Sequence, residues 1–205
     1  MQAWLEHRIL SRKSRPGVGL GITLIYVLIL IAPQILMTNT LVAVFPPEIQ
    51  PWLRMFSNLS VWAIVPMGIA VWLILSHAVD ACALLLGAHE GDSKRTMEIF
   101  GYALIPAVLL GLIADVILFT ATRGVQLTGM GAEAVTEFTQ ALGSSIWVQL
   151  ALSISRTGLQ LSMVVLGLLV TLSYRTNWRV GFTAVILPVG TWWGLTELVS
   201  KVAAR

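Results

Sequence analysis

Long uncharged stretches alternate with short polar ones along this chain. Residues 16–47 contain no charged side chain, and residues 55–79 contain none except His77. A bilayer core about 30 Å thick is crossed by about 20 helical residues, so uncharged runs of this length predict membrane-spanning helices. The pattern predicts an all-α, polytopic transmembrane bundle of five spans, at residues 18–37, 61–86, 99–119, 146–174 and 180–199.

The segments between the expected spans are of two kinds. Residues 39–60 hold three prolines, which stop helices and favour extended backbone, so this segment is expected to be a loop. Residues 120–145 carry little positive charge and are expected to be a second long loop. The other two connections, at residues 87–98 and 175–179, are short polar turns.

Positive charge predicts the orientation of the bundle. Residues 1–16 form a basic cytoplasmic or interfacial segment, residues 17–200 the transmembrane domain and residues 201–205 a short tail. Eight Lys and Arg residues lie at the N-terminus and in the two short turns, against four on the opposite side. Because cytoplasmic loops carry the excess of positive charge, the N-terminus is expected in the cytoplasm and the C-terminus outside. The expected location is the cytoplasmic (inner) membrane of a prokaryote.

Composition excludes several functional classes. The chain is 57% hydrophobic and 11% charged, whereas soluble domains carry about 25% charged residues. The basic residues lie at span ends, where topology alone would place them, so no nucleic-acid partner is expected. One cysteine, Cys82, excludes an internal disulfide and a cysteine-cluster metal site. No HExxH, GxSxG, P-loop or CxxC motif occurs, so we expect neither an enzyme nor a cofactor.

Three ionisable residues inside the expected spans are candidates for chemistry. At about 1.5 Å per residue, Asp115, Arg156 and Glu197 lie about 24 to 27 Å from the cytoplasmic ends of their spans. Charges at such depth are costly and usually paired, so Arg156 is expected to bridge Asp115, Glu197 or both. The set would either line a path for an ion or proton, or act as a buried ionic clamp.

His77 and Asp80 form a second candidate set near the cytoplasmic end of the second span. Their i, i+3 spacing places them on one helical face. A histidine–carboxylate pair could bind a metal or relay a proton. The alternative is an interfacial pair that reaches Lys94 or Arg95.

Small residues four apart predict close helix contacts. Gly158 and Ser162 form such a pair in the fourth span, and Gly190 and Gly194 form a GxxxG motif in the fifth. Both could pack within the bundle. Either could also bind another membrane protein or a second copy of this chain.

The turn between the second and third spans has its own physical interpretation. Its glycines permit a tight reversal of the chain, and Asp92 or Ser93 would suit the N-cap of the next helix. Gly101 would allow close approach to a neighbouring helix. Pro106 is expected to break the hydrogen-bond ladder, and the freed carbonyl then needs another partner. This segment would serve as a hinge or docking surface, or simply as a kinked and well-packed helix.

This turn and helix contain the residues Gly87, Gly91, Phe100, Gly101, Tyr102 and Pro106. With them the segment resembles the Yip1-domain family of five-span membrane proteins. The chain has Gly87-Ala88 where many microbial relatives have two glycines. About fifteen residues precede the first expected span, whereas eukaryotic members have a long N-terminal region associated with Rab GTPase binding, so the microbial type is expected. That activity is therefore not carried over. The resemblance implies a non-enzymatic scaffold or accessory protein.

Two functions are expected from these observations. The first is a scaffold, assembly factor or accessory subunit that contacts other integral membrane proteins within the bilayer. The alternative is a small transporter or an ion- or proton-conducting protein built on Asp115, Arg156 and Glu197. Neutralising Asp115 would separate them, because a transporter would lose flux and a clamp would lose stability.

Overall fold

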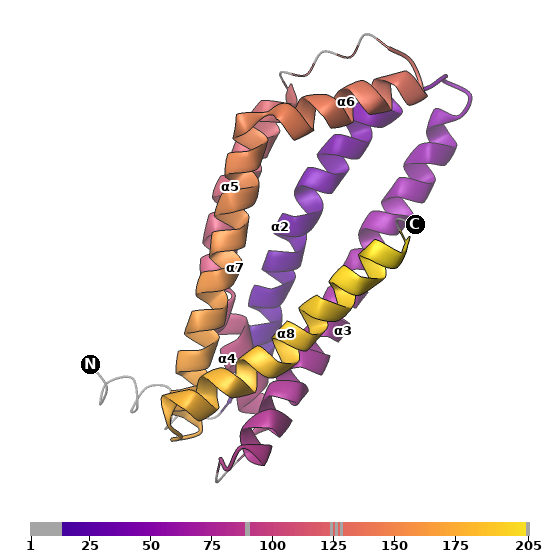
Figure 1. Ribbon diagram of the computed structural model, residues 1–205. Helices are drawn as coiled ribbons and strands as arrows, with labels where there is room; N and C mark the ends of the chain where they lie inside the picture. Colours follow the sequence, from indigo (N-terminus) through magenta and orange to yellow (C-terminus); the bar gives the residue numbers. More distant parts are fainter. Residues whose placement is uncertain (1–13, 89–90, 124, 126, 128, 204–205) are drawn as a thin grey trace. The chain divides into compact units, whose positions relative to one another are not determined.

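The computed structural model describes residues 14–88, 91–123, 125, 127 and 129–203, and within these ranges the regular structure is entirely helical (Figure 1). The basic segment expected at residues 1–16 lies mostly outside the described residues. The helices, in chain order, are α2 (Pro16–Val42), α3 (Gln50–Leu85), α4 (Ser93–Ala103), α5 (Ile105–Arg123), α6 (Ala132–Ser144), α7 (Ile146–Ser173) and α8 (Trp178–Ala203).

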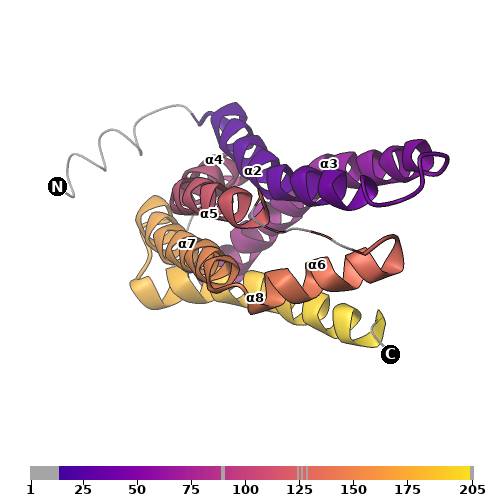
Figure 2. The same cartoon turned by 90° about the horizontal axis from the view of Figure 1, so that it is seen from above.

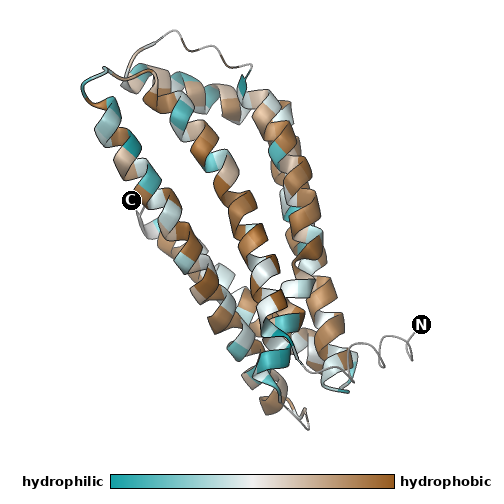
Figure 3. Cartoon of the chain, turned by 180° about the vertical axis from the view of Figure 1, so that it is seen from behind, coloured by the Kyte–Doolittle hydropathy of each residue, from teal (hydrophilic) through white to brown (hydrophobic). Residues whose placement is uncertain are grey.

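In the part of the chain that the structure describes, four helices are long and apolar enough to cross a membrane. They are α2, α3, the α4–α5 segment Ser93–Arg123, and α7. Apolar residues cover most of these helices, while hydrophilic residues concentrate toward helix ends and connections (Figure 3). The all-α class is therefore confirmed for the described residues, and four helices have the length and composition expected of membrane spans. α8 is 26 residues long and is not among these four.

The prediction of a loop at residues 39–60 is wrong at both ends of that segment. α2 continues to Val42 and α3 begins at Gln50, so only residues 43–49 connect them. Pro46 and Pro47 do lie in this connection, whereas Pro51 is the second residue of α3. A proline in the first turn of a helix disrupts no intrahelical bond, since its missing N–H would have had no partner there.

The loop expected at residues 120–145 is wrong as well, because α6 occupies half of it. α6 buries Ala134 and Phe138, which lie one turn apart, while Glu133 on the same helix is exposed. The helix lies transverse to α7, which it precedes, and its start lies at the α2–α3 connection, where the N–H of Gly131 donates to the carbonyl of Val44 at 3.3 Å (Figure 1, Figure 2). Burial of one narrow face is typical of an amphipathic helix.

The chain divides into two compact units. Unit 1 comprises Met1–Thr23, Ile69–Ile105 and Gln160–Arg205, and unit 2 comprises Leu24–Gly68 and Pro106–Leu159. The core of unit 1 is made of Trp72, Leu75, Val79, Ala83, Ile99, Phe100, Ala103, Leu166, Val170, Tyr174, Ala184 and Val185. Unit 2 has two smaller clusters, made of Ala114, Leu118, Val148 and Ala151 and of Val27, Ile31 and Val61.

Glycines bring α2 and α4 into backbone contact within unit 1. A Cβ added to Gly101 would lie 2.2 Å from the Cα of Gly19, and one added to Gly19 would lie 2.3 Å from the carbonyl oxygen of Met97. No side chain larger than hydrogen fits at either position. The expectation that Gly101 permits close helix packing is confirmed.

The third expected span is divided by a short break. α4 ends at Ala103 and α5 begins at Ile105, with Pro106 as its second residue. Proline has no N–H, so the carbonyl of Tyr102 loses its usual helical donor. Backbone N–H groups of the C-cap donate instead to the carbonyls of Gly101 and Tyr102. The expected break at Pro106 is confirmed, and the helix end itself satisfies the freed carbonyl.

Candidate functional site: two carboxylates in apolar helices

Asp80, on α3 in unit 1, lies in a cluster of hydroxyl groups. Its side chain is 8% exposed. Ser93 Oγ donates to Asp80 Oδ2 at 2.7 Å, and the hydroxyl of Tyr174 donates to Oδ1. Thr96, which is fully buried, places its Oγ1 3.5 Å from Oδ1 and against the Tyr174 hydroxyl. We call these four residues the hydroxyl cluster.

Local structure at the start of α4 positions two members of the cluster. Asp92 is the N-cap, and its side chain accepts hydrogen bonds from the backbone N–H groups of Lys94 and Arg95 at 3.0 and 3.2 Å. This cap satisfies donors that the first helical turn leaves without partners. It fixes the start of the helix, so that Ser93 and Thr96 lie one turn apart. The expected N-cap at Asp92 is confirmed.

The turn before α4 brings that helix back along α3. Gly87 has a φ of 95°, which favours glycine, and the N–H of Ala88 donates to the carbonyl of Ala83 at 3.0 Å. α3 therefore ends in a tight reversal. The glycine that the sequence placed in this turn has the conformational role expected of it.

The expected pair of His77 and Asp80 is not formed. His77 is exposed, and its Nδ1 lies 2.8 Å from the carbonyl oxygen of Leu73 on the same helix. Nδ1 must carry the proton to donate in this arrangement. Asp80 instead accepts from hydroxyl groups, which the next helix and the end of α7 bring to it.

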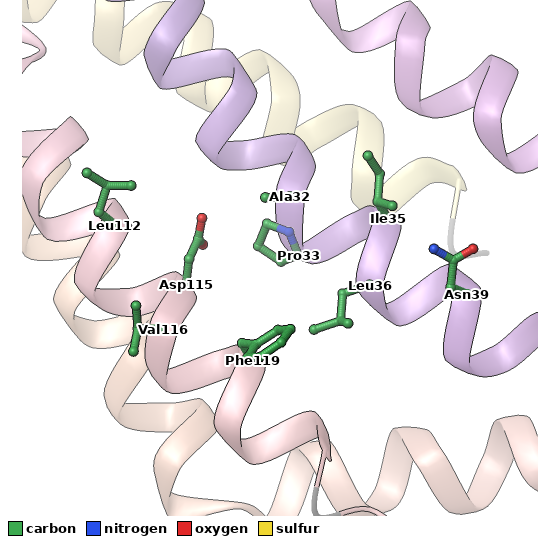
Figure 4. Close-up of a pocket in the computed structure, with 9 residues that line it drawn as sticks. All are labelled: Ala32, Pro33, Ile35, Leu36, Asn39, Leu112, Asp115, Val116 and Phe119. Carbon is green, nitrogen blue, oxygen red and sulfur yellow. The ribbon is translucent and has the colours of Figure 1, made fainter.

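Asp115, on α5 in unit 2, has a different environment. It is partly buried and faces a cavity of about 470 Å³ between α2 and α5 (Figure 4). Its carboxylate is directed toward Ala32 and Pro33 in this view. No hydrogen bond or ion pair joins Asp115 to any part of the chain that the structure describes. The cavity is lined by Ala32, Pro33, Ile35, Leu36, Asn39, Leu112, Asp115, Val116 and Phe119.

The expected ionic set is not assembled among the described side chains. Arg156 is exposed on α7, and no ion pair links it to Asp115. Gly158, two residues later, faces α5: a Cβ there would lie 3.1 Å from the Cα of Ala107. Two residues correspond to about 200° of helical rotation, so Arg156 points away from α5. The side chain of Glu197 lies outside the described residues.

The two small-residue motifs differ in what packs against them. Gly158 packs on α5, and Ser162 is buried, so this motif serves packing within the chain. Gly190 and Gly194 are exposed, and a Cβ added to either would meet no atom within 4 Å. Among the described residues, none therefore packs on the GxxxG motif of α8.

Sequence reasoning missed the hydroxyl cluster as a unit. Tyr174 lies 94 positions from Asp80, and no local spacing links them. The sequence did contain one indication of such a cluster, which is Asp80 itself. A carboxylate in an apolar helix requires hydrogen-bond donors. Within the described ranges, no three His, Cys, Asp or Glu side chains are placed to share a metal ion.

Comparisons with known proteins add no identification. No family model matches this chain, and neither a curated protein nor a solved structure matches it.

Proposed function

We propose that this chain is a five-span protein of the cytoplasmic membrane of a prokaryote, with its N-terminus in the cytoplasm and its C-terminus outside. The proposal is supported by the four long apolar helices and by the length of α8, which would supply the fifth span. The excess of Lys and Arg at the N-terminus and in the two short turns supports the orientation.

Within that membrane, the proposed role is that of a non-enzymatic scaffold, assembly factor or accessory subunit. One observation carries it: a Cβ added to Gly190 or Gly194 on α8 would meet no described atom within 4 Å. Trp192 and Trp193 beside them are 37% and 50% exposed. Small residues four apart let a second helix approach closely, so the fitting partner is a membrane-spanning helix of another protein.

Similarity to the Yip1-domain family stays part of this proposal. It is supported by the positive φ of Gly87 and by the backbone contact of Gly101, which give two of the family-like residues a structural reason. It implies the same accessory type of role.

A second candidate function is transport or conduction through the cavity at Asp115. The observation in its favour is a carboxylate that faces a cavity of about 470 Å³ and has no partner in the described part of the chain. An ionisable residue in such a position usually marks a substrate or ion pathway. Loss of flux in an Asp115→Asn variant that keeps its fold would support this candidate.

The scaffold proposal is tested by mild-detergent purification from native membranes, followed by mass spectrometry of the proteins that co-migrate. The test variant is Gly190→Leu combined with Gly194→Leu, because neither site has a neighbour within 4 Å that the larger side chain would displace. Gly17→Leu is the matched control, since Gly17 on α2 is equally open.

A stoichiometric membrane protein should co-migrate with the wild type and the control and be lost from the double variant. A self-association lost in the same way would instead identify the partner as a second copy of this chain. A partner that the double variant retains would contradict the role given to α8. A clean monomer in every sample would contradict the scaffold function.

A further inference from the structure

The cavity at Asp115 is apolar except for two groups. Its lining has one carboxylate, Asp115, and one amide, Asn39; the remaining side chains are hydrocarbon (Figure 4). A volume of about 470 Å³ falls within the range of about 300 to 1,000 Å³ that is typical of small-molecule sites. The cavity therefore has the size and composition of a binding site for an apolar body with one polar group.

The carboxylate needs a partner that the described chain does not supply. Charged groups in apolar surroundings are stabilised by pairing or by hydrogen bonds. Arg156 points away from α5, as shown above. Arg123 is about two helical turns beyond Asp115 on α5, and its guanidinium lies 4.0 Å from the ring centroid of Phe119. The chain thus leaves a single negative charge on the cavity wall.

The chemistry of the lining distinguishes among cations. Hard inorganic ions such as Ca²⁺ take six to eight oxygen ligands in proteins, and Mg²⁺ demands near-octahedral oxygen coordination. Asp115 and Asn39 provide three side-chain oxygens at most. An organic cation needs no such shell, because it makes one charge contact and otherwise buries hydrocarbon. The lining therefore suits a lipophilic organic cation.

We propose that this cavity binds a monovalent organic cation with an apolar body, with the positive group against Asp115 and the apolar part against Leu36, Leu112 and Phe119. This site would define the substrate class of the second candidate function. It does not depend on the scaffold role, because the cavity lies in α2 and α5 whereas the open GxxxG motif lies on α8.

The test uses the purified full-length chain in nanodiscs of neutral phosphatidylcholine. The probes are radiolabelled tetraphenylphosphonium and tetraphenylborate, which have nearly the same size and shape but opposite charge. Empty nanodiscs give the partitioning of each probe into lipid. Saturable binding of the phosphonium beyond this background, without saturable binding of the borate, is the expected result. Equal binding of both ions, or no saturable binding of either, would overturn the proposal.

Variants tie the binding to the cavity. Asp115→Asn should weaken phosphonium binding by about tenfold or more, because the charge contact is lost. Glu133→Gln removes the same charge from an exposed position on α6 and should leave binding unchanged. Leu112→Trp fills the cavity, keeps the carboxylate and should also abolish binding. Thermal unfolding of each variant checks its fold.

The outcomes separate this site from the proposed functions. Gly190→Leu combined with Gly194→Leu should bind the phosphonium as the wild type does, whether or not it loses its protein partner. Phosphonium binding that survives Asp115→Asn with the same affinity would contradict the site. Binding without flux in proteoliposomes would keep the site and refute transport.

Discussion

Asp80 and Asp115 are both carboxylates in long apolar helices, and the chain treats them in opposite ways. Asp80, in unit 1, is buried and accepts hydrogen bonds from Ser93 and Tyr174. Asp115, in unit 2, faces a cavity and has no partner among the described residues. The carboxylate of Asp80 links helices through hydrogen bonds, whereas the carboxylate of Asp115 faces the cavity.

This difference shows that a carboxylate in a membrane helix is not by itself evidence of function. What matters is whether donors surround it. A carboxylate with satisfied hydrogen bonds contributes to stability, and removing it leaves its donors without partners. A carboxylate without donors costs stability, so its retention calls for a ligand or a partner. Each prediction below tests one side of this contrast.

The largest effect is expected for Asp80→Ala. The substitution removes the carboxylate that accepts from the hydroxyl groups of Ser93 and Tyr174, whereas Thr96 keeps the carbonyl of Asp92 as an acceptor at 3.1 Å. Hydrogen bonds to charged groups contribute about 1.5 to 3 kcal/mol each, so the free energy of unfolding should fall by about 3 kcal/mol or more. Denaturant-induced unfolding in detergent micelles measures it. Asp115→Ala is the matched control and should change stability little; equal losses in the two variants would remove the contrast.

A smaller loss is expected for Tyr174→Phe. The ring stays in the core of unit 1, while the hydroxyl that contacts both Asp80 and Thr96 is removed. The unfolding free energy should fall by about 1 to 2 kcal/mol. In an Asp80→Ala background the same substitution should cost much less, because interacting residues are not additive. Full additivity in this double-mutant cycle would show that the hydroxyl and the carboxylate are not coupled.

Ser93→Ala should have a still smaller effect. It removes the donor to Asp80 Oδ2 from a partly buried position, which corresponds to about 1 kcal/mol. Ser153→Ala is the control, since Ser153 is exposed and donates only to the carbonyl of Gln149 on its own helix. The same unfolding measurement applies. A loss at Ser153 as large as that at Ser93 would mean that the effect is one of serine in a helix rather than of the cluster.

The sequence predicts the large features of the fold because hydrophobic length is a strong local signal. The long apolar runs identify α2, α3, α5 and α7. It fails at α6 because the apolar face of that helix is narrow, although Ala134 and Phe138 already have helical spacing. It also fails at the start of α3, because a proline reads as a helix breaker unless its position in the first turn is known.

The candidate sites were predicted in part for a similar reason. Asp80 and Asp115 stand out in the sequence because each is a charge within an apolar run. Their partners do not stand out, since His77 is close to Asp80 in sequence while Tyr174 is close to it only after folding. Arg156 has a suitable depth, but depth does not determine which way a side chain points around its helix. Rotational position within a bundle is set by packing, such as that of Gly158 on α5.

The smallest effect is expected for Asp115→Asn, and it tests the contrast most directly. Because the described chain gives this carboxylate no partner, neutralising it should change the unfolding free energy by no more than about 0.5 kcal/mol, or stabilise the protein. In the double variant, the changes in unfolding free energy caused by Asp115→Asn and Arg156→Gln should be additive. An interaction energy of about 1 kcal/mol or more in this cycle would mean that the two charges pair in the membrane. Asp115 would then be a structural residue like Asp80, and the cavity would have no charge left to offer a ligand.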